Sequence, residues 1–284
     1  MKIGIVGLGL IGGSLGFDLR QRQHTVVGIS RRAETGDLAL RQGAVDIAAT
    51  SLEAIAAAQL VFVCTPIAAV APAVKQLASF LPASTVITDV GSVKTHIVKA
   101  ASLHWPNFVG GHPMAGKAEA GLAAAEAGLF DQRPYVITPT VATPPNAISL
   151  VEEVARSLGC HLYRCPPETH DRAVAWISHL PVMISAALIQ ACLSESELDV
   201  MQLAQQLASS GFRDTSRVGG GNPELGTMMA QFNQAALLQA LQGYRQQLDQ
   251  IIDQVASQDW PTLQQTLQQS HQTRPQFVDR PPAH

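Results

Sequence analysis

Charged residues are scarce in this sequence. Only 14% of its 284 residues are charged, 46% are hydrophobic, and the formal net charge is -3. So little charge beside so much apolar character excludes a disordered or coiled-coil chain and predicts a large buried core. No basic excess is present, which argues against a protein that binds nucleic acid or a membrane surface, although basic residues could still line one pocket.

Cysteine is also sparse. The four cysteines are Cys64, Cys160, Cys165 and Cys192, and none belongs to a C-x-x-C pair. We therefore expect neither a metal site nor a disulfide framework, and a reducing cytoplasm is the expected compartment. The N-terminus enters a strand-like run at once, with no sign of a secretory signal.

Long uninterrupted hydrophobic runs are absent. Residues 54–74 carry no charge and are long enough to span a bilayer. However, Thr65-Pro66 and Pro72 interrupt them, and residues 60–64 form a short β-like run. We expect a buried strand between two helical segments here, and no membrane span.

The chain divides into two halves of different character. The first alternates apolar strands with helices and predicts a parallel sheet covered on both faces, which is a doubly wound α/β domain. After Pro166-Pro167 the periodicity is helical. We expect domains at 1–166 and 167–284. The expected strands are 3–6, 26–29, 60–64, 86–88, 108–110 and 135–138, and the first two expected helices are 11–22 and 34–42.

The helical half contains one long apolar seam at alternating steps of four and three residues. Such a seam faces either the core of its own subunit or a symmetry mate. Because a helical domain of this size has a small core of its own, we expect a homodimer through this half. The proline-containing tail, residues 274–284, is expected to be ordered only by docking. The seam residues are Leu237, Leu241, Tyr244, Leu248, Ile251 and Val255.

A glycine motif, Gly7-Leu8-Gly9-Leu10-Ile11-Gly12, lies between the first expected strand and helix. This is the context in which G-x-G-x-x-G binds a dinucleotide. Gly7 permits the tight turn, Gly9 lets a pyrophosphate approach, and Gly12 lets helix and strand pack closely. The alternative is a glycine-rich turn without a ligand. We expect a Rossmann-type dinucleotide-binding domain in which Gly7, Gly9, Leu10, Ile11 and Gly12 contact the cofactor.

The end of the second strand bears on which dinucleotide binds. An NAD site has Asp or Glu there, but this sequence has Ser30-Arg31-Arg32. Ser30 can hydrogen-bond a 2′-phosphate, and either arginine can neutralise it, so NADP is the expected cofactor. The alternative is a pair of solvated surface arginines. Thr65 and Pro66, which follow another strand, are also expected cofactor contacts.

Further candidates follow the later strands. Ser92 and Lys94 come directly after the strand at 86–88, where parallel strands line a ligand crevice. His112, within Gly110-Gly111-His112-Pro113-Met114-Ala115-Gly116, is expected on a loop beyond the next strand, where it suits acid–base work. The alternatives are a salt bridge for Lys94 and an exposed or packed role for His112.

The helical half adds four polar candidates. His179 precedes an apolar helix and is either a helix-start residue or a pocket donor. Arg213, Asp214 and Arg217 lie beside a glycine-rich turn, and an arginine there is a natural carboxylate clamp. An ion pair of Asp214 with either arginine, without a substrate role, is the alternative.

Taken in order, these motifs resemble the prephenate/arogenate dehydrogenases of tyrosine biosynthesis, from Lys2 to about Gly226. The resemblance implies oxidative decarboxylation of a cyclohexadiene, with hydride transfer to the nicotinamide. It implies that His112 accepts a hydrogen bond from the substrate hydroxyl and that Ser92 orients the hydroxyl and the nicotinamide. Arg217 would bind a substrate carboxylate, and His179 would be a second polar contact.

Several alternatives stay open. Asp214 lies one helical turn before Arg217 and could bind an ammonium, which favours arogenate over prephenate as substrate, with Arg213 nearby. A β-hydroxyacid-type dehydrogenase, with Lys94 carrying the chemistry, is the alternative enzyme. A dinucleotide-sensing regulator is the alternative outside enzymes. The sequence assigns no role to Lys117 or Arg133.

Overall fold

The structure is a computed structural model that describes residues 1–117 and 119–278. It divides into two compact units, Met1–Gln234 and Ala235–His284. The expected domain boundary at residues 166 and 167 stays a prediction. Of the proline-containing tail, residues 275–278 form the short helix α13 (Pro275–Val278), and residues 279–284 lie outside the described part.

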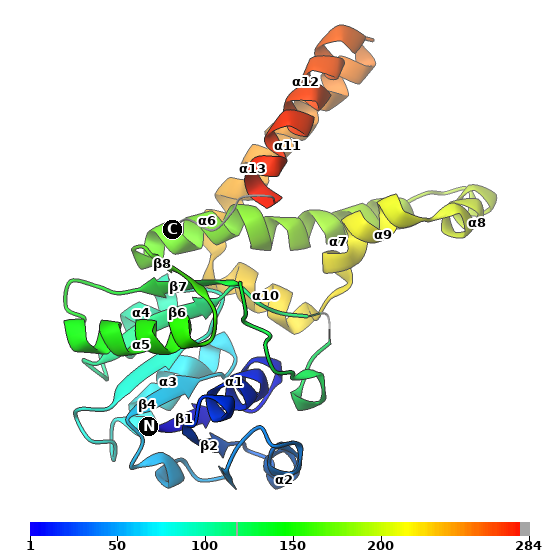
Figure 1. Ribbon diagram of the computed structural model, residues 1–284. Helices are drawn as coiled ribbons and strands as arrows, with labels where there is room; N and C mark the ends of the chain where they lie inside the picture. The colour runs from blue at the N-terminus through cyan, green and yellow to red at the C-terminus, as the bar shows by residue number, and fades with distance from the viewer. Residues whose placement is uncertain (118, 279–284) are drawn as a thin grey trace. The chain divides into compact units, whose positions relative to one another are not determined.

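The first unit contains one eight-stranded sheet in the order β3-β2-β1-β4-β5-β6-β7-β8 (Figure 1). The order reverses between β1 and β4, and such a switch point is where ligands bind outside the carboxyl ends of the strands. The strands are β1 (Lys2–Val6), β2 (Thr25–Ile29), β3 (Ile47–Ala49), β4 (Leu60–Val63), β5 (Val86–Asp89), β6 (Phe108–Pro113), β7 (Pro134–Thr138) and β8 (His161–Arg164).

Helices cover both faces of this sheet, as the apolar strands predict. Alternate residues of β4 enter opposite cores: Leu60 and Phe62 pack with α1, α2 and α5, whereas Val61 and Val63 pack with α3 and α4. The helices are α1 (Leu10–Gln21), α2 (Ala33–Gln42), α3 (Ile67–Leu77), α4 (Thr95–Ala101) and α5 (Pro145–Ser157), with short 3-10 turns η1 (Leu52–Ile55) and η2 (Leu122–Ala124). The doubly wound α/β architecture is confirmed.

Three expectations about the sheet need correction. It is not parallel throughout, because β7 runs antiparallel to β6, with β8 parallel to β7. The strands β3 and β8 were not expected from the sequence. Both are short edge strands, and neither has the long apolar run that a buried central strand requires.

The helical half of the first unit begins with one long helix, visible in green in Figure 1. It consists of α6 (Pro167–Val174), a π-helical turn η3 (Ala175–His179) and α7 (Leu180–Leu193). Proline at its first position favours its start there. By length and composition, Pro167–Leu193 could cross a membrane, and most of its residues are not buried. Residues 54–74 instead contain strand β4 and most of helix α3, as expected.

The remaining helices of the first unit lead back to the sheet. They are α8 (Leu198–Leu207), α9 (Ser210–Ser216), the 3-10 turn η4 (Arg217–Gly220) and α10 (Pro223–Phe232). Asn222 caps α10, since its Oδ1 accepts the N–H of Glu224 at 2.8 Å. Phe232 packs against the core that α3 and α4 share, so α10 lies on that face of the sheet.

The second unit contains α11 (Gln234–Ala256), α12 (Trp260–Thr273) and α13. Asp259 caps α12 by accepting the N–H of Thr262 at 3.2 Å. The apolar seam lies on α11, as expected. In the single chain, its residues Tyr244, Leu248 and Val255 are exposed.

Candidate active site

The glycine turn between β1 and α1 has the close contacts that its sequence predicts. Gly7 has a φ of +101°, and a Cβ there would lie 2.6 Å from the carbonyl oxygen of Cys64. A Cβ on Gly12 would lie 2.0 Å from the carbonyl oxygen of Gly7. At Gly9, in contrast, a Cβ would meet nothing within 4 Å. The first and third glycines therefore serve the turn itself, and the second leaves open space.

The surroundings of this turn fit a dinucleotide. Gly9 is the N-cap of α1 and offers no side chain to its first N–H groups, which leaves them available to a phosphate. Thr65 follows β4 beside the turn, and its buried Oγ1 has no hydrogen-bond partner among residues 1–117 and 119–278. The backbone of Pro66, the N-cap of α3, follows directly. Residues at the ends of β1 and β4 can thus hold a pyrophosphate, and a bound dinucleotide would supply the hydride acceptor.

The end of β2 carries the residues expected to choose between dinucleotides. Ser30 Oγ accepts the backbone N–H of Arg32 at 3.3 Å. The residue at the end of this strand is thus a serine and not the aspartate or glutamate of an NAD site. Arg31 and Arg32 are exposed, and neither forms an ion pair with any residue in the described ranges. Both guanidinium groups therefore remain available to an anion.

His112 and Ser92 lie at the carboxyl ends of neighbouring parallel strands, β6 and β5. His112 was expected on a loop. Instead it is the penultimate residue of β6, paired with Val136 of β7, and its side chain is only 8% exposed. The reversed strand β7 extends the sheet past Gly110, which is why the loop expectation was wrong. Ser92 is half-buried in the loop between β5 and α4.

A second histidine, His170, contacts His112, although no motif in the sequence indicates it. Nδ1 of His112 lies 2.8 Å from Nε2 of His170, and Nδ1 of His170 lies 2.8 Å from Oδ1 of Asp171. All three side chains are buried. The only local signal was a His-Asp pair soon after Pro166-Pro167, which is common on solvated helices.

Asp171 is the anchor of this group. Its Oδ1 accepts the backbone N–H of Lys94 at 2.7 Å and its Oδ2 accepts that of Thr95 at 2.8 Å. Burial alone would raise the pKa of Asp171, but the hydrogen bonds from His170, Lys94 and Thr95 outweigh burial and lower it. Asp171 is therefore ionised and accepts hydrogen bonds only.

Lys94 is fully buried and its ammonium is engaged. It pairs with Asp89 and donates a hydrogen bond to the carbonyl of Gly111 at 2.6 Å. Asp89 in turn accepts the N–H groups of Gly91 at 2.8 Å and Gly111 at 3.1 Å. Lys94 thus forms a salt bridge, as one of the two interpretations of the sequence predicts, and the pair braces the backbone on both sides of the site.

His179 is the member of this cluster that follows His170 and Asp171 in the helical half. It ends the π-helical turn η3 and is fully buried, with its Nδ1 3.2 Å from Nδ2 of Asn233. The same amide of Asn233 donates to the backbone carbonyl of Asp171 at 2.8 Å. Nε2 of His179 lies near the Ser92 backbone without a hydrogen bond of ordinary geometry.

Burial keeps both site histidines uncharged. Desolvation, together with the nearby positive forms of His170, Lys94 and His179, holds the pKa of His112 well below its ordinary value. Burial lowers the pKa of His179 to about 4, although Asp171 opposes that shift. At neutral pH the two rings are neutral, and each has one donor and one acceptor nitrogen.

The expected carboxylate clamp lies on α9 and η4. Nε of Arg213 is 3.7 Å from Oδ1 of Asp214, and these side chains are 76% and 75% exposed. Arg217 is exposed and forms no ion pair with another described residue. The segment packs on α7, where Ser185 Oγ accepts the N–H of Gly219 at 2.8 Å. No hydrogen bond among the described residues links Arg213, Asp214 or Arg217 to His112.

Two residues to which the sequence assigns no role lie outside the cluster of His112, His170, Asp171 and His179. Lys117 forms an ion pair with Glu126, and Arg133 is exposed.

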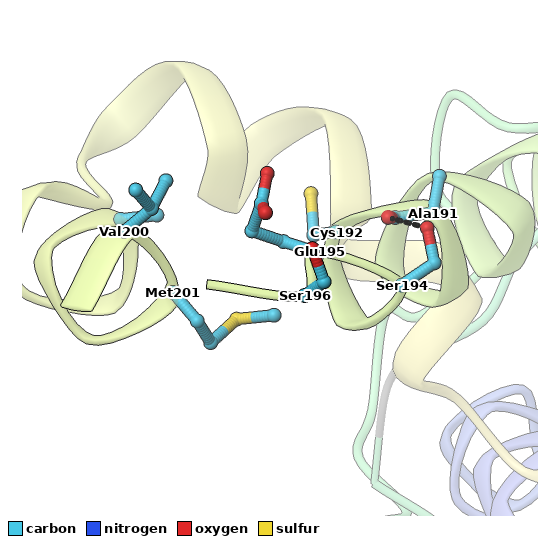
Figure 2. A pocket seen from close by; sticks show the side chains of 8 residues that line it. Ala191, Cys192, Ser194, Glu195, Ser196, Val200 and Met201 are labelled. Carbon is cyan, nitrogen blue, oxygen red and sulfur yellow. Dashed lines mark hydrogen bonds between the residues drawn. The ribbon is translucent and has the colours of Figure 1, made fainter. Parts of the chain in front are cut away.

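A hollow of about 360 Å³ lies between α7 and α8, with Val200 and Met201 on one side and Cys192 on the other (Figure 2). It begins twelve residues beyond His179, about 18 Å along the helix, so it is not part of the site.

Comparison with known protein families identifies both halves of the chain. Residues 15–164 match the family model described as "Prephenate dehydrogenase, nucleotide-binding domain", and residues 166–269 match "Prephenate dehydrogenase, dimerization domain". The prephenate dehydrogenase of Bacillus subtilis is 30% identical over 266 residues, which are 91% of this chain and 71% of that protein. The cyclohexadienyl dehydrogenase of Zymomonas mobilis is 29% identical over 96% of this chain and 94% of that protein.

Solved structures extend the likeness. The arogenate dehydrogenase of Synechocystis is 53% identical, with a TM-score of 0.87, over 98% of this chain and 100% of that chain. The prephenate dehydrogenase of A. aeolicus, in complex with hydroxyphenyl propionate and NAD+, is 25% identical, with a TM-score of 0.92, over 98% of each chain. A 3-hydroxyisobutyrate dehydrogenase of Mycobacterium tuberculosis, at 13% identity and a TM-score of 0.58, shares only the fold. The chain therefore belongs to the prephenate dehydrogenase family and is a dehydrogenase.

Proposed function

We propose that this dehydrogenase oxidatively decarboxylates arogenate to tyrosine with NADP as hydride acceptor. The observation that carries the proposal is the placement of His112. Its Nδ1 is engaged by His170, so Nε2 is the free nitrogen, at the sheet edge that also carries Ser92 and the glycine turn. A neutral, buried imidazole there is suited to accept the proton of a substrate hydroxyl.

The chain's own residues then perform simple tasks. His112 accepts the hydroxyl proton as the carbon–oxygen bond gains double-bond character; a bound nicotinamide would supply the acceptor for the hydride from that carbon. The ring carboxylate leaves as carbon dioxide, and its bonding electrons make the ring aromatic. His112 returns the proton to the phenol oxygen. Ser92 orients the hydroxyl, and His179 supplies a second polar contact.

Arogenate is the proposed substrate for two reasons. The 53% identity to an arogenate dehydrogenase is higher than the identity to the prephenate dehydrogenases cited above. The acidic side chain of Asp214, one turn before Arg217, also suits an ammonium beside a carboxylate, as in a zwitterionic side chain. Arg217→Ala is expected chiefly to raise the KM for substrate, because a carboxylate clamp acts in the ground and transition states alike.

A homodimer in the cytoplasm completes the proposal. The match to a dimerization domain, the exposed seam on α11 and the exposed apolar residues of α8, such as Leu198 and Leu203, all support self-association. The four cysteines are free, which suits a reducing compartment. A monomer by light scattering at micromolar concentration would contradict the dimer.

The decisive assay supplies arogenate or prephenate with NADP or NAD and follows the absorbance of the reduced cofactor. Highest catalytic efficiency with arogenate and NADP is expected. Higher efficiency with prephenate would replace the substrate, and higher efficiency with NAD would replace the cofactor. No turnover in any combination would overturn the proposed function.

A further inference from the structure

We propose that Asp171 sets opposite tautomers of the two buried histidines: through His170 it leaves Nε2 of His112 a hydrogen-bond acceptor, and through Asn233 it leaves Nε2 of His179 a donor. His170, Asp171 and Asn233 are thereby positioning residues. The chemical use of the two tautomers rests on the proposed function, but the tautomers themselves do not.

The first half follows from the chain of contacts that begins at the carboxylate. Asp171 can only accept, so Nδ1 of His170, 2.8 Å away, must carry a proton. When His170 holds this one ring proton, its Nε2 is bare and faces Nδ1 of His112, 2.8 Å away. Nδ1 of His112 must donate, and its Nε2 is left with a free lone pair. This is the tautomer that can accept a hydroxyl proton.

The second half follows from the amide of Asn233. Its Nδ2 carries two hydrogens: one is donated to the backbone carbonyl of Asp171 at 2.8 Å, and the other faces Nδ1 of His179 at 3.2 Å. Nδ1 of His179 is therefore the acceptor, and the single ring proton is on Nε2. That N–H is buried and faces the Ser92 backbone, which places the donor of His179 next to the loop that carries Ser92.

The two neutral rings thus present complementary groups, an acceptor on His112 and a donor on His179. The charged groups that face them are the carboxylate of Asp171 and the ammonium of Lys94, and Lys94 is itself paired with Asp89. A protonated His112 would be buried near that ammonium and could no longer act as a base. Fixed neutral tautomers give the site one acceptor and one donor at neutral pH.

Nitrogen NMR on the full-length protein with 15N-labelled histidine tests this without substrate. At pH 7, we expect the signals of His112 to show a protonated Nδ1 and a bare Nε2, and those of His179 to show the reverse. Replacing each histidine in turn assigns the signals, and the exposed His104 serves as the reference. Finding His112 protonated on Nε2, or His179 on Nδ1, would overturn the proposal.

Variants of His170 test the link to catalysis. In His170→Gln, the side-chain oxygen can still accept from Nδ1 of His112, whereas in His170→Asn the shorter amide can reach only Asp171. We expect His170→Asn to lower kcat about 10- to 100-fold, the size typical of residues that orient a ligating or reacting histidine, with the KM for NADP unchanged. His170→Gln should recover part of that loss. Equal losses in both, with an unchanged His112 spectrum, would contradict the positioning role.

Asn233→Asp tests the other arm. A carboxylate can only accept, so the proton of His179 should move to Nδ1, and the KM for substrate should rise while the His112 spectrum stays as in the parent protein. An unmoved His179 proton would contradict this arm. If the parent protein turns over neither arogenate nor prephenate, the proposed function fails, whereas the NMR result still decides the tautomers.

Discussion

The ammonium of Lys94 donates a hydrogen bond to the carbonyl of Gly111, 2.6 Å away, the residue directly before His112. The same ammonium is paired with Asp89, and both side chains have no solvent exposure. A lysine so enclosed cannot reach a substrate, and it instead holds β5 and the end of β6 at a fixed separation.

We therefore expect Lys94→Met to act on stability. Removing one partner of a buried pair strands the other charge and costs about 3–5 kcal/mol in the free energy of unfolding. Urea denaturation measures this, and Lys75→Met on the exposed face of α3 is the matched control, with an expected change of about 0.5 kcal/mol or less. A Lys94→Met protein that is as stable as the parent but inactive would instead make Lys94 the catalytic group.

His112→Asn should cripple turnover while NADP still binds. General acid–base groups contribute on the order of a hundred- to ten-thousand-fold, and His112 has no cofactor-holding role in the site described above. Steady-state kcat and the quenching of tryptophan fluorescence by NADP separate the two effects. The exposed His104→Asn serves as the control. If the His112→Asn enzyme keeps most of its kcat, another group is the base.

Stability should fall as the pH is lowered from 6.5 towards 4. The pKa of His179 is about 4 in the folded protein and about 6.5 when unfolded, so between these values the unfolded chain takes up a proton that the folded chain refuses. This costs roughly 2 kcal/mol at pH 5 relative to pH 7. Urea unfolding of the parent and of His179→Gln at both pH values measures it. A variant with the same pH dependence as the parent would show that His179 is not the source.

Ser30→Asp should shift the cofactor preference from NADP towards NAD. The carboxylate would pair with the ribose hydroxyls and repel a 2′-phosphate. Catalytic efficiencies with both cofactors give the ratio, and Ser30→Asn, which has the same shape without the charge, is the control. A parallel loss with both cofactors would mean that Ser30 has only a structural role.

Asp214→Asn should lower efficiency with arogenate and raise it with prephenate, because the carboxylate that attracts an ammonium also repels a keto oxygen. Arg213→Gln removes the ion-pair partner of Asp214 and leaves the carboxylate of Asp214 charged. It therefore separates the effect of that carboxylate on the substrate from the loss of the Arg213–Asp214 pair. Equal losses on both substrates would show that Asp214 only positions its neighbours.

The fold and the dinucleotide turn are readable from the sequence because their signals are local. Gly7, Gly9 and Gly12 lie within six residues, and each buried strand has its own apolar run. The group around His112 is different. His112 and His170 are 58 residues apart, Lys94 and Asp171 are 77 apart, and His179 and Asn233 are 54 apart. No periodicity or spacing encodes such contacts, so His170, Asp171 and Asn233 were not selected.

Contacts between residues far apart in the sequence also explain why His112 was wrongly expected on a loop. Its place in a strand depends on β7, whose reversed direction cannot be inferred from the run Phe108–Gly110 alone. The sequence indicates His179 because it precedes an apolar helix, but its contact with Asn233, 54 residues away, has no local signal.

The bonds from Asp171 to the backbone of Lys94 and Thr95 join two segments that a break near residue 166 would separate. A protein ending there would keep its glycine turn but would lose His170 and Asp171, the groups that contact His112 and the start of α4. A helical half taken from another protein would need a carboxylate at the position of Asp171 to accept the amides at the start of α4.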